Sequence, residues 1–376
     1  MKFNSKTWTF LSKLEHRIAV TDKSYYRKAY QSYMSAVEWR NVEMANEFAV
    51  FLKDGHSMFH YPYFSQTAEL WSIFGKSCRA ARRHNKYSEI IVSEYMLMSL
   101  FVGVFTSIEL LPKGILSLFL NFVLPSENPH SEMQTHLSNY YTEYAHKLET
   151  VPFYEHNYTE AYYDLSKKYR SGGTKSWTDW FTWQCLSTEI RCKELISVPL
   201  RYLFHKDDYL ATTKILVKYQ VSKMEHLTEA QAIDKFISKI KQIHSQLPNT
   251  VIEILDSHIY TDKSSVDGSM LIYALLNTPR FRAFIPVVNA LAEHQIQVEK
   301  IAGQENIQVK CNINAVPNGI LEKVNKLPHV TPLYQYFSSN RYRLFNVLDV
   351  PVNQLTNTIR DINGIKGTQT EFIHNF

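Results

Sequence analysis

The sequence predicts an α+β protein with two domains, a large all-α helical domain followed by a small α/β sandwich. Long apolar stripes at helical spacing fill the first part of the chain, and the 376 residues include only 11 glycines, which suggests few tight turns. A polar stretch then precedes a change to the alternating pattern of strands. We therefore place the helical domain at 1–260, a linker at 261–269 and the α/β domain at 270–376.

Charge and cysteine content narrow the class of protein. Charged residues make up 20% of the chain and the net charge is +5 without a basic block, which argues against a nucleic-acid-binding protein. The four cysteines are scattered, and the amino-terminal stretch lacks the continuous apolar core of a signal peptide. We expect a cytoplasmic protein in a reducing compartment.

The first part of the chain predicts an arm and two helices. Residues 1–25 carry Trp8 and Phe10 but too few apolar positions to fold alone, so they resemble an arm that packs onto something else. Apolar residues at helical spacing predict a helix at 26–53 and another at 65–85, with an aromatic, irregular stretch between them.

Residues 90–124 are the most apolar part of the chain. A membrane span needs roughly 20 uninterrupted apolar residues. Here the longest run, Tyr95 to Ile108, is cut by Glu109, by Pro112-Lys113-Gly114 and then by Asn121. Two buried core helices fit this pattern better than the alternative, a hairpin that dips into a membrane.

One candidate metal motif follows, in a predicted helix. Glu143 and His146 form a Glu-x-x-His pair, the spacing that carboxylate-bridged di-iron bundles use on one helical face. Such a site needs two pairs and a Glu from each of two further helices. The only other pair, Glu371 and His374, lies in a strand-like context, and Glu109 is the one possible lone partner. The set is incomplete, so polar residues on a helix surface are the simpler interpretation.

Residues 177–226 form the predicted centre of the helical domain. Trp180, Trp183 and Ile190 recur at helical spacing in a first long helix, and a second helix is predicted over 210–224, after a short break. The wide apolar stripes indicate burial on more than one side. A further helix at 233–247 and a short one ending near residue 255 complete the helical domain.

The last part of the chain reads as alternating strands and helices. Strands are predicted at 270–276, 296–301, 306–313, 334–337, 342–348 and 368–373, with helices at 280–294, 320–327 and 352–362. The turn at 277–279, which contains Asn277, precedes the first of these helices. We expect helices to cover one face of the sheet and leave the other face free to dock.

The helical part resembles the β subunit of the hydroxylase in bacterial multicomponent di-iron monooxygenases, the phenol, toluene, alkene and methane enzymes. The similar features are Lys6-Thr7-Trp8-Thr9-Phe10-Leu11, Asp179-Trp180-Phe181, Glu194-Leu195-Ile196-Ser197-Val198-Pro199-Leu200, Asp207-Asp208 and Lys223-Met224-Glu225-His226. The match covers most of residues 5–245 as a pattern of helices and short sequences. It implies a ferritin-like helical domain.

The later part of the chain has two resemblances. Residues 268–325 are similar to the small coupling (effector) protein of the same enzyme systems, through the strand at 270–276, the Asn277 turn and the strands around Gly303. Residues 306–376 also resemble the ligand-sensing domain of leucine-responsive-type regulators, although no helix-turn-helix precedes them. We rank the coupling domain first.

The first-ranked resemblance implies an accessory component, without catalytic residues, of an enzyme that hydroxylates a hydrocarbon or aromatic substrate with O2. Iron would sit in a larger α subunit, a small γ subunit is an optional further component, and a reductase would supply electrons from NADH. This chain would bind no metal, flavin or nucleotide and would contact neither nucleic acid nor membrane. Trp8, Phe10 and Asn277 are the candidate contacts with the α subunit, although Asn277 also suits an ordinary helix N-cap.

Two other functions stay open at this point. A stand-alone helical di-metal oxygenase would use Glu143 and His146, with Glu109, as iron ligands. A regulatory protein would instead sense a small molecule through its C-terminal domain.

Overall fold

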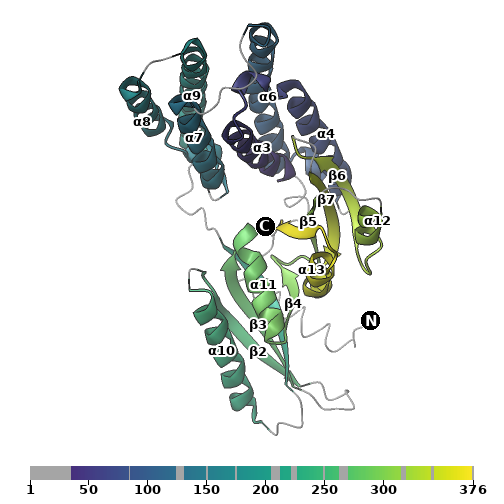
Figure 1. The fold of residues 1–376 in the computed structure, drawn as a ribbon. Coiled ribbons are helices and arrows are strands. Elements are labelled where there is room, and N and C mark those ends of the chain that lie inside the picture. The colour runs from purple at the N-terminus through teal and green to yellow at the C-terminus, as the bar shows by residue number, and fades with distance from the viewer. Residues whose placement is uncertain are drawn as a thin grey trace. The chain divides into compact units, whose positions relative to one another are not determined.

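The computed structural model describes residues 35–83, 85–123, 131–149, 151–173, 176–204, 212–221, 227–248, 250–261, 270–314, 319–339 and 343–374. The chain divides into two compact units. The helical unit comprises Met34–Tyr209 and Ser338–Arg341, and the sheet unit comprises Met1–Tyr33, Leu210–Phe337 and Tyr342–Phe376. The protein therefore mixes a helical part with a part built on antiparallel sheets (Figure 1).

The described part of the helical unit consists mainly of long helices. Its elements are α3 (Ala36–Lys53), η1 (Met58–His60), α4 (Tyr63–Ala81), α5 (Tyr87–Ile91), α6 (Glu94–Leu120), α7 (Glu132–Leu148), η2 (Phe153–Glu155), α8 (Tyr158–Ser171) and α9 (Trp177–Phe204). Side-chain caps begin several of them. Ser93, Ser131 and Asn157 accept a backbone N–H from the first turn of α6, α7 and α8, which satisfies a donor that the helix itself leaves unpaired.

Aromatic rings fill the core of this unit. The ring of Phe48 on α3 lies 4.8 Å from that of Tyr61 and 4.7 Å from that of Tyr141 on α7, both edge to face. Leu52, Leu70 and other buried residues of α3, α4 and α7 surround them. The high aromatic content of the sequence therefore builds a core in which each Tyr must also place a hydroxyl.

Helix α6 corrects the prediction for residues 90–124. It is one helix of 27 residues that runs through Pro112, where two helices were expected. Its packed side consists largely of small residues: a Cβ on Gly103 would lie 3.3 Å from the Trp71 ring, and one on Gly114 would lie 3.0 Å from the Phe64 ring. Glycine at these two positions therefore lets α6 pack closely against rings of α4. Much of its apolar surface is exposed instead of buried.

The sheet unit contains two four-stranded antiparallel sheets. The first is built from β1 (Thr212–Val221), α10 (Glu229–Gln246), β2 (Glu253–Thr261), β3 (Met270–Pro279), η4 (Phe281–Ala283), α11 (Phe284–Glu293) and β4 (Ile296–Ile301). The second is built from β5 (Asn306–Asn314), α12 (Ile320–Asn325), β6 (Thr331–Phe337), β7 (Arg343–Pro351), η5 (Val352–Gln354), α13 (Leu355–Gly364) and β8 (Thr368–Ile373).

The two sheets repeat one topology. The strand orders are β2-β3-β1-β4 and β6-β7-β5-β8, so each half is a βαββαβ unit with its first strand between the third and the fourth. This is the ferredoxin-like arrangement. The contacts between the halves are also reciprocal, because η5 packs against β4 while η4 packs against β8. The sheet unit is a tandem duplication of one supersecondary unit.

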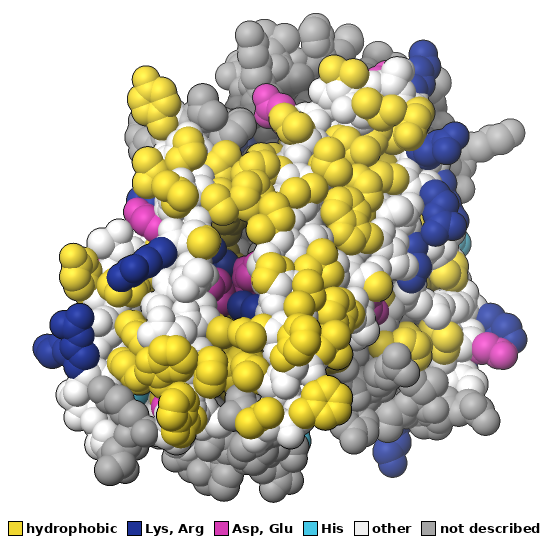
Figure 2. All heavy atoms as spheres, turned by 90° about the horizontal axis from the view of Figure 1, so that it is seen from above, with side chains coloured by type: hydrophobic (Ala, Val, Ile, Leu, Met, Phe, Trp, Pro, Cys, Tyr) yellow, Lys and Arg dark blue, Asp and Glu magenta, His cyan; other side chains and the backbone are white. Residues whose placement is uncertain are grey.

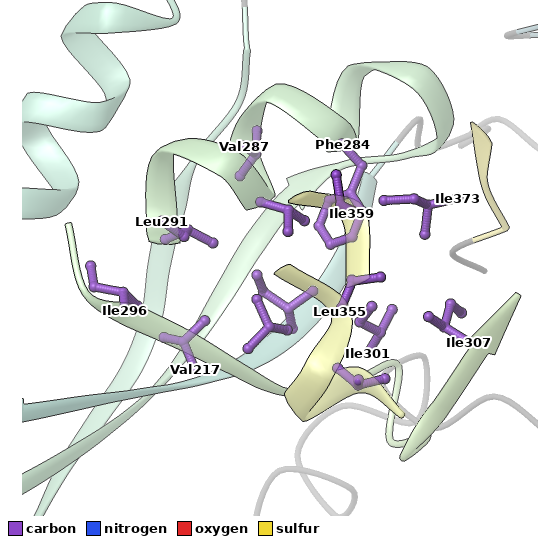
Figure 3. Packing of buried hydrophobic residues seen from close by; sticks show 14 of the residues in the cluster. Val217, Phe284, Val287, Leu291, Ile296, Ile301, Ile307, Leu355, Ile359 and Ile373 are labelled. Atoms are coloured by element: carbon purple, nitrogen blue, oxygen red, sulfur yellow. The ribbon is translucent and has the colours of Figure 1, made fainter. Parts of the chain in front are cut away.

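One apolar core joins the two repeats (Figure 3). Phe284, Val287 and Leu291 project from α11 toward side chains of β1 and β4, while Leu355 and Ile359 of α13 lie in the same cluster. Ile307 of β5 and Ile373 of β8 lie in the same cluster. Because the cluster draws on both repeats, we expect them to unfold together.

The observed division of the chain differs from the expected one. Residues 212–221, predicted as part of a helix over 210–224, form strand β1, and the predicted short helix near residue 255 gives way to β2. The expected linker at 261–269 falls between β2 and β3, which pair with each other. Within 270–376, β3 and β4 belong to the first sheet and β5 to β8 to the second. The compact units divide at residue 210, because β1 is the central strand that β3 and β4 both need.

Candidate functional site

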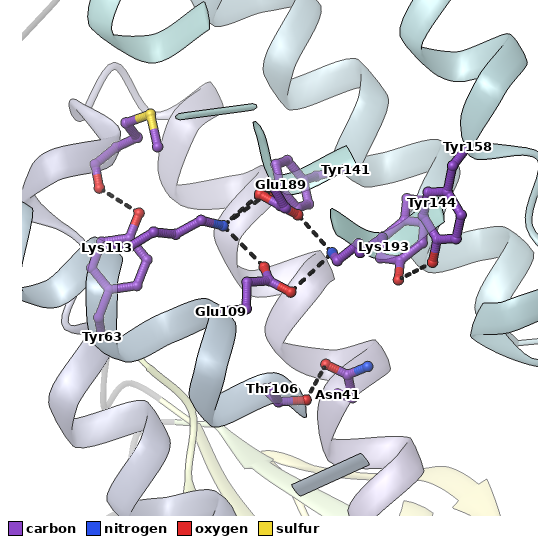
Figure 4. Close-up of polar contacts among 11 residues, drawn as sticks. Asn41, Tyr63, Thr106, Glu109, Lys113, Tyr141, Tyr144, Tyr158, Glu189 and Lys193 are labelled. Carbon is purple, nitrogen blue, oxygen red and sulfur yellow. Dashed lines mark hydrogen bonds and ion pairs between the residues drawn. The ribbon is translucent and has the colours of Figure 1, made fainter. Parts of the chain in front are cut away.

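Four charged side chains form a closed ring of ion pairs between α6 and α9 (Figure 4). The Lys113 Nζ lies 2.9 Å from a Glu109 oxygen and 2.5 Å from a Glu189 oxygen. The Lys193 Nζ lies 3.0 Å from the other Glu109 oxygen and 2.6 Å from the other Glu189 oxygen. Each helix contributes a Glu and, four residues later, a Lys. We call these four residues the charge ring.

Burying four charged groups costs free energy, which the attraction between opposite charges in the ring has to offset. Burial alone would raise the pKa of Glu189, but Lys113 and Lys193 outweigh it and hold that pKa far below its ordinary value. Burial would likewise lower the pKa of both lysines, whereas the two carboxylates raise them. The opposite charges of the ring therefore compensate one another for their loss of water. The Tyr141 hydroxyl adds a hydrogen bond of 2.6 Å to Glu189.

A layer of tyrosines continues from the ring toward α8. The Lys193 ammonium lies 4.6 Å from the centre of the Tyr144 ring, and the hydroxyls of Tyr144 and Tyr158 are 3.0 Å apart. His156 packs edge-on against both rings. Burial, followed by the charges of Lys147 and Lys193, lowers the pKa of His156 to about 4. The imidazole is consequently neutral at physiological pH.

A cavity of about 720 Å³ lies beside the charge ring, and aromatic and aliphatic side chains make up most of its wall. Its apolar lining is Val102, Phe105, Ile108, Pro112, Leu116, Phe153, Trp180, Phe181 and Ile196, and its polar lining is Asn41, Thr106, Tyr144, Gln184, Thr188 and the ring. Cys185 and Cys192 also line it. The cavity has the size and character of a small-molecule site, with a few polar groups in an apolar wall.

The outward sides of α6 and α9 carry an apolar surface, which we call the apolar face. Figure 2 shows apolar side chains in broad bands, with a few acidic and basic side chains in the hollow between them. Its exposed members are Leu97, Leu100, Val104, Ile108, Leu111, Ile115, Leu118, Phe119, Phe122 and Val123 along and after α6, and Trp177, Trp180, Leu195, Val198 and Tyr202 on α9. Contiguous exposed apolar surface of this extent marks interaction sites.

By length and composition, α6 also passes the test for a membrane-spanning helix. It is the one helix in the described part of the chain that does so, and 28% of its most apolar window is buried. Two of its charged residues, Glu109 and Lys113, belong to the charge ring with α9.

The residues of the alternative metal site are not brought together. Glu143 and His146 lie on the exposed side of α7, where the His146 side chain is 84% exposed and 3.9 Å from Glu149. Glu109 instead pairs with the two lysines of the charge ring. Among the described residues, no group of three or more His, Cys, Asp or Glu side chains could hold a metal ion. The ring itself suits a cation poorly, because its two carboxylates already contact two ammonium groups.

The remaining candidate residues are placed as follows. Asn277 lies within β3, opposite Lys214 of β1 and Glu253 of β2, so the predicted turn and helix cap at 277–279 are wrong. The strand simply continues to Pro279 before η4 begins. Trp8 and Phe10 lie outside the described residues.

Sequence reasoning missed Lys113, Glu189 and Lys193. The available signal was a Glu-x-x-x-Lys spacing that occurs in both apolar helices, at 109–113 and at 189–193. That spacing is also the commonest surface ion pair of helices. Only the approach of α6 to α9 turns it into a buried ring.

Comparisons with known proteins do not identify a family. No protein-family model matches the chain, and no curated protein matches it. Among solved structures the chain is similar to the crystal structure of an unknown protein from Galdieria sulphuraria, at 12% identity and a TM-score of 0.17, over 43% of this chain and 97% of that one. A TM-score this low supports no argument about function.

Proposed function

We propose that this chain is a non-catalytic subunit that binds a larger protein through the apolar face of its helical unit. The observation that carries the proposal is the way apolar and small or polar residues are distributed around α6. Its packed side contains Ser99, Gly103, Lys113 and Gly114, while leucines, isoleucines and phenylalanines point outward. A partner protein that covered this apolar side would be bound favourably, because burying apolar surface contributes about 25 cal/mol for each Å² removed from water.

In its narrower form, the proposal makes the chain the β-subunit-like component of a multicomponent di-iron monooxygenase. The resemblance supports this for the part of residues 5–245 that lies in the helical unit, whereas residues 212–221, expected to be helical, form β1 of the sheet unit. A ferritin-like fold of the helical unit is part of the same proposal. The charge ring is consistent with it, because lysines neutralise the inward carboxylates of α6 and α9. Iron would then belong to the larger subunit, with electrons from a separate NADH-dependent reductase, and the complex would be cytoplasmic.

The role of the sheet unit has two candidates. The coupling role rests on the resemblance of residues 268–325, a segment that spans β3 and β4 of one repeat and β5 of the next. The ligand-sensing role has a specific observation in its favour: residues 306–376 of that resemblance coincide with one complete βαββαβ repeat, β5 to β8. Ligand-dependent association of the chain with itself, without a larger subunit, would favour the second role.

Co-expression tests the main proposal. The full chain is produced with a larger subunit from a neighbouring gene that carries two Glu-x-x-His motifs, and complexes are sized by light scattering. We expect a stable complex whose iron resides in the larger subunit. Phe119→Asp on the apolar face should weaken it strongly, whereas Tyr163→Asp, an equally exposed aromatic on α8, should not. Equal effects of the two variants, or iron in this chain, would overturn the proposal.

A further inference from the structure

We propose that the cavity between α6 and α9 is a binding site for a small, uncharged, largely apolar molecule such as an aromatic or aliphatic hydrocarbon or its alcohol. The inference goes beyond a purely structural role for the helical unit. It concerns the isolated chain, so it stands or falls independently of any larger subunit.

The size and walls of the cavity indicate the ligand's bulk. About 720 Å³ falls in the range that holds a small organic molecule. Phe105 and Phe153 contribute rings from α6 and η2, and Trp180 and Phe181 contribute rings from α9. The rings of Trp180 and Phe181 lie 4.9 Å apart, edge to face. Ring faces and edges on both sides favour a flat or chain-like apolar guest.

The charge ring indicates that the guest is neutral. Every ammonium of the ring contacts two carboxylates and every carboxylate contacts two ammonium groups, so no unpaired charge faces the cavity from the ring. An anionic guest would have to displace Glu109 or Glu189, and a cationic guest would meet Lys113 and Lys193. An uncharged molecule keeps all four pairs intact. Complementarity of charge therefore selects against fatty acids and amines.

The polar groups at the rim allow one hydroxyl on the ligand. Thr188 and Gln184 line the cavity on successive turns of α9, and both are exposed side chains. A hydroxyl is small enough to reach either of them while the rest of the molecule stays in the aromatic wall. An alcohol should therefore bind at least as well as the hydrocarbon of equal length.

The cavity opens on the apolar face. Ile108 and Trp180 line it and are also 59% and 45% exposed. A ligand can enter the isolated chain from solvent here. The partner of the proposed function would cover this opening and receive or retain the ligand.

Titration of the full chain with the neutral fluorophore N-phenyl-1-naphthylamine tests the site, with n-decane, decanol and decanoate as competitors. We expect saturable binding, displacement by decane and decanol, and weak displacement by decanoate. Thr188→Phe, which projects a ring into the cavity from an exposed position, should weaken binding about tenfold or more, or about 1.4 kcal/mol. Leu97→Phe is the matched control, because Leu97 lies on the apolar face, is 61% exposed and does not line the cavity.

Three results would overturn the inference. The first is equal loss of probe binding in Thr188→Phe and Leu97→Phe, which would place the probe on the surface. The second is decanoate displacing the probe better than decanol. The third is no saturable binding by a chain whose circular dichroism shows native helix content. Quenching of Trp180 by the bound probe, removed in Trp180→Phe, gives a second readout at the cavity itself.

Discussion

Removing one charge from the ring should destabilise the helical unit severely. In Glu189→Gln, the ammonium groups of Lys113 and Lys193 lose contacts of 2.5 and 2.6 Å and must share Glu109 alone. Breaking a buried ion pair by removing one partner costs about 3–5 kcal/mol, because the remaining charge has left water without compensation. Glu189 is also the acceptor for Tyr141, so its loss leaves a weaker acceptor for a buried hydroxyl.

The assay is urea unfolding followed by tryptophan fluorescence. Trp39, Trp71, Trp177, Trp180 and Trp183 all belong to the helical unit, so the signal reports mainly on that unit. The matched control is Glu194→Gln on the same helix, whose pair with Arg201 is 2.8 Å long but about one-third exposed. Exposed pairs contribute about 0–1 kcal/mol.

Comparing the two variants tests whether the ring is a buried network. A loss in Glu189→Gln no larger than that in Glu194→Gln would refute the ring as a buried, mutually compensating network. The double variant Glu189→Gln/Lys193→Met restores charge balance, with Glu109 and Lys113 still paired. It should therefore lose less than the two single variants added together, by about 0.5–3 kcal/mol.

Three further outcomes follow from named contacts. Burial lowers the pKa of His156 from 6.5 to about 4 in the folded chain. Below pH 6.5 the unfolded chain therefore binds a proton that the folded chain does not, so the stability present above pH 6.5 is lost as the pH falls toward 4. His156→Phe should flatten a pH dependence of up to roughly 3 kcal/mol in urea unfolding across that window, and an unchanged slope would contradict this assignment. Arg40→Met should cost about 3–5 kcal/mol in the same assay, because fully buried Arg40 lies 3.1 to 3.7 Å from Glu43, Glu47 and Glu69; a cost under about 1 kcal/mol would contradict it. In a flotation assay with anionic vesicles, the full chain should stay at the bottom of the gradient, because inserting Glu109 and Lys113 into a bilayer costs a few kcal/mol each. Flotation together with the vesicles would instead show that the apolar face binds a membrane.

Parts of the helical unit follow from local signals. Helix α4 (Tyr63–Ala81) corresponds to the helix predicted at 65–85, and α9 contains the tryptophan stripe around Trp183. Helix α6 was misread because Pro112 and Gly114 are strong breakers in isolation, whereas in the fold Gly114 is the position at which α6 packs closely against Phe64. Its exposed face was misread because apolar residues were expected to point inward.

Strand β1 was missed for a different reason. Buried Ile215, Val217, Tyr219 and Val221 alternate with less buried residues, and Leu216, buried on the other face, interrupts that period. The run Ile215-Leu216-Val217 was therefore read as part of a helical stripe, because a short apolar run cannot be told from a helix by period alone. Without β1, the first βαββαβ repeat could not be recognised. Residues 210–260, with β1, α10 and β2, were therefore assigned to the helical domain although they belong to the sheet unit. The duplication becomes visible only when strand order is known.

The candidate site could not be foreseen from single residues. The pair of Glu143 and His146 drew attention because of its spacing, yet both side chains point away from the core. Glu189 and Lys193 resembled an ordinary surface pair, and their role depends on the approach of a helix some 80 positions earlier, seen in the contact between Lys113 and Glu189. Tertiary pairing of charges is not encoded in local spacing.

Iron analysis of the purified full-length chain, produced in iron-supplemented medium, tests the central claim most directly. If the carboxylates of α6 and α9 serve an ion-pair ring in a non-catalytic subunit, iron will be far below one atom per chain. Stoichiometric iron that disappears in Glu109→Ala or Glu189→Ala would contradict the account.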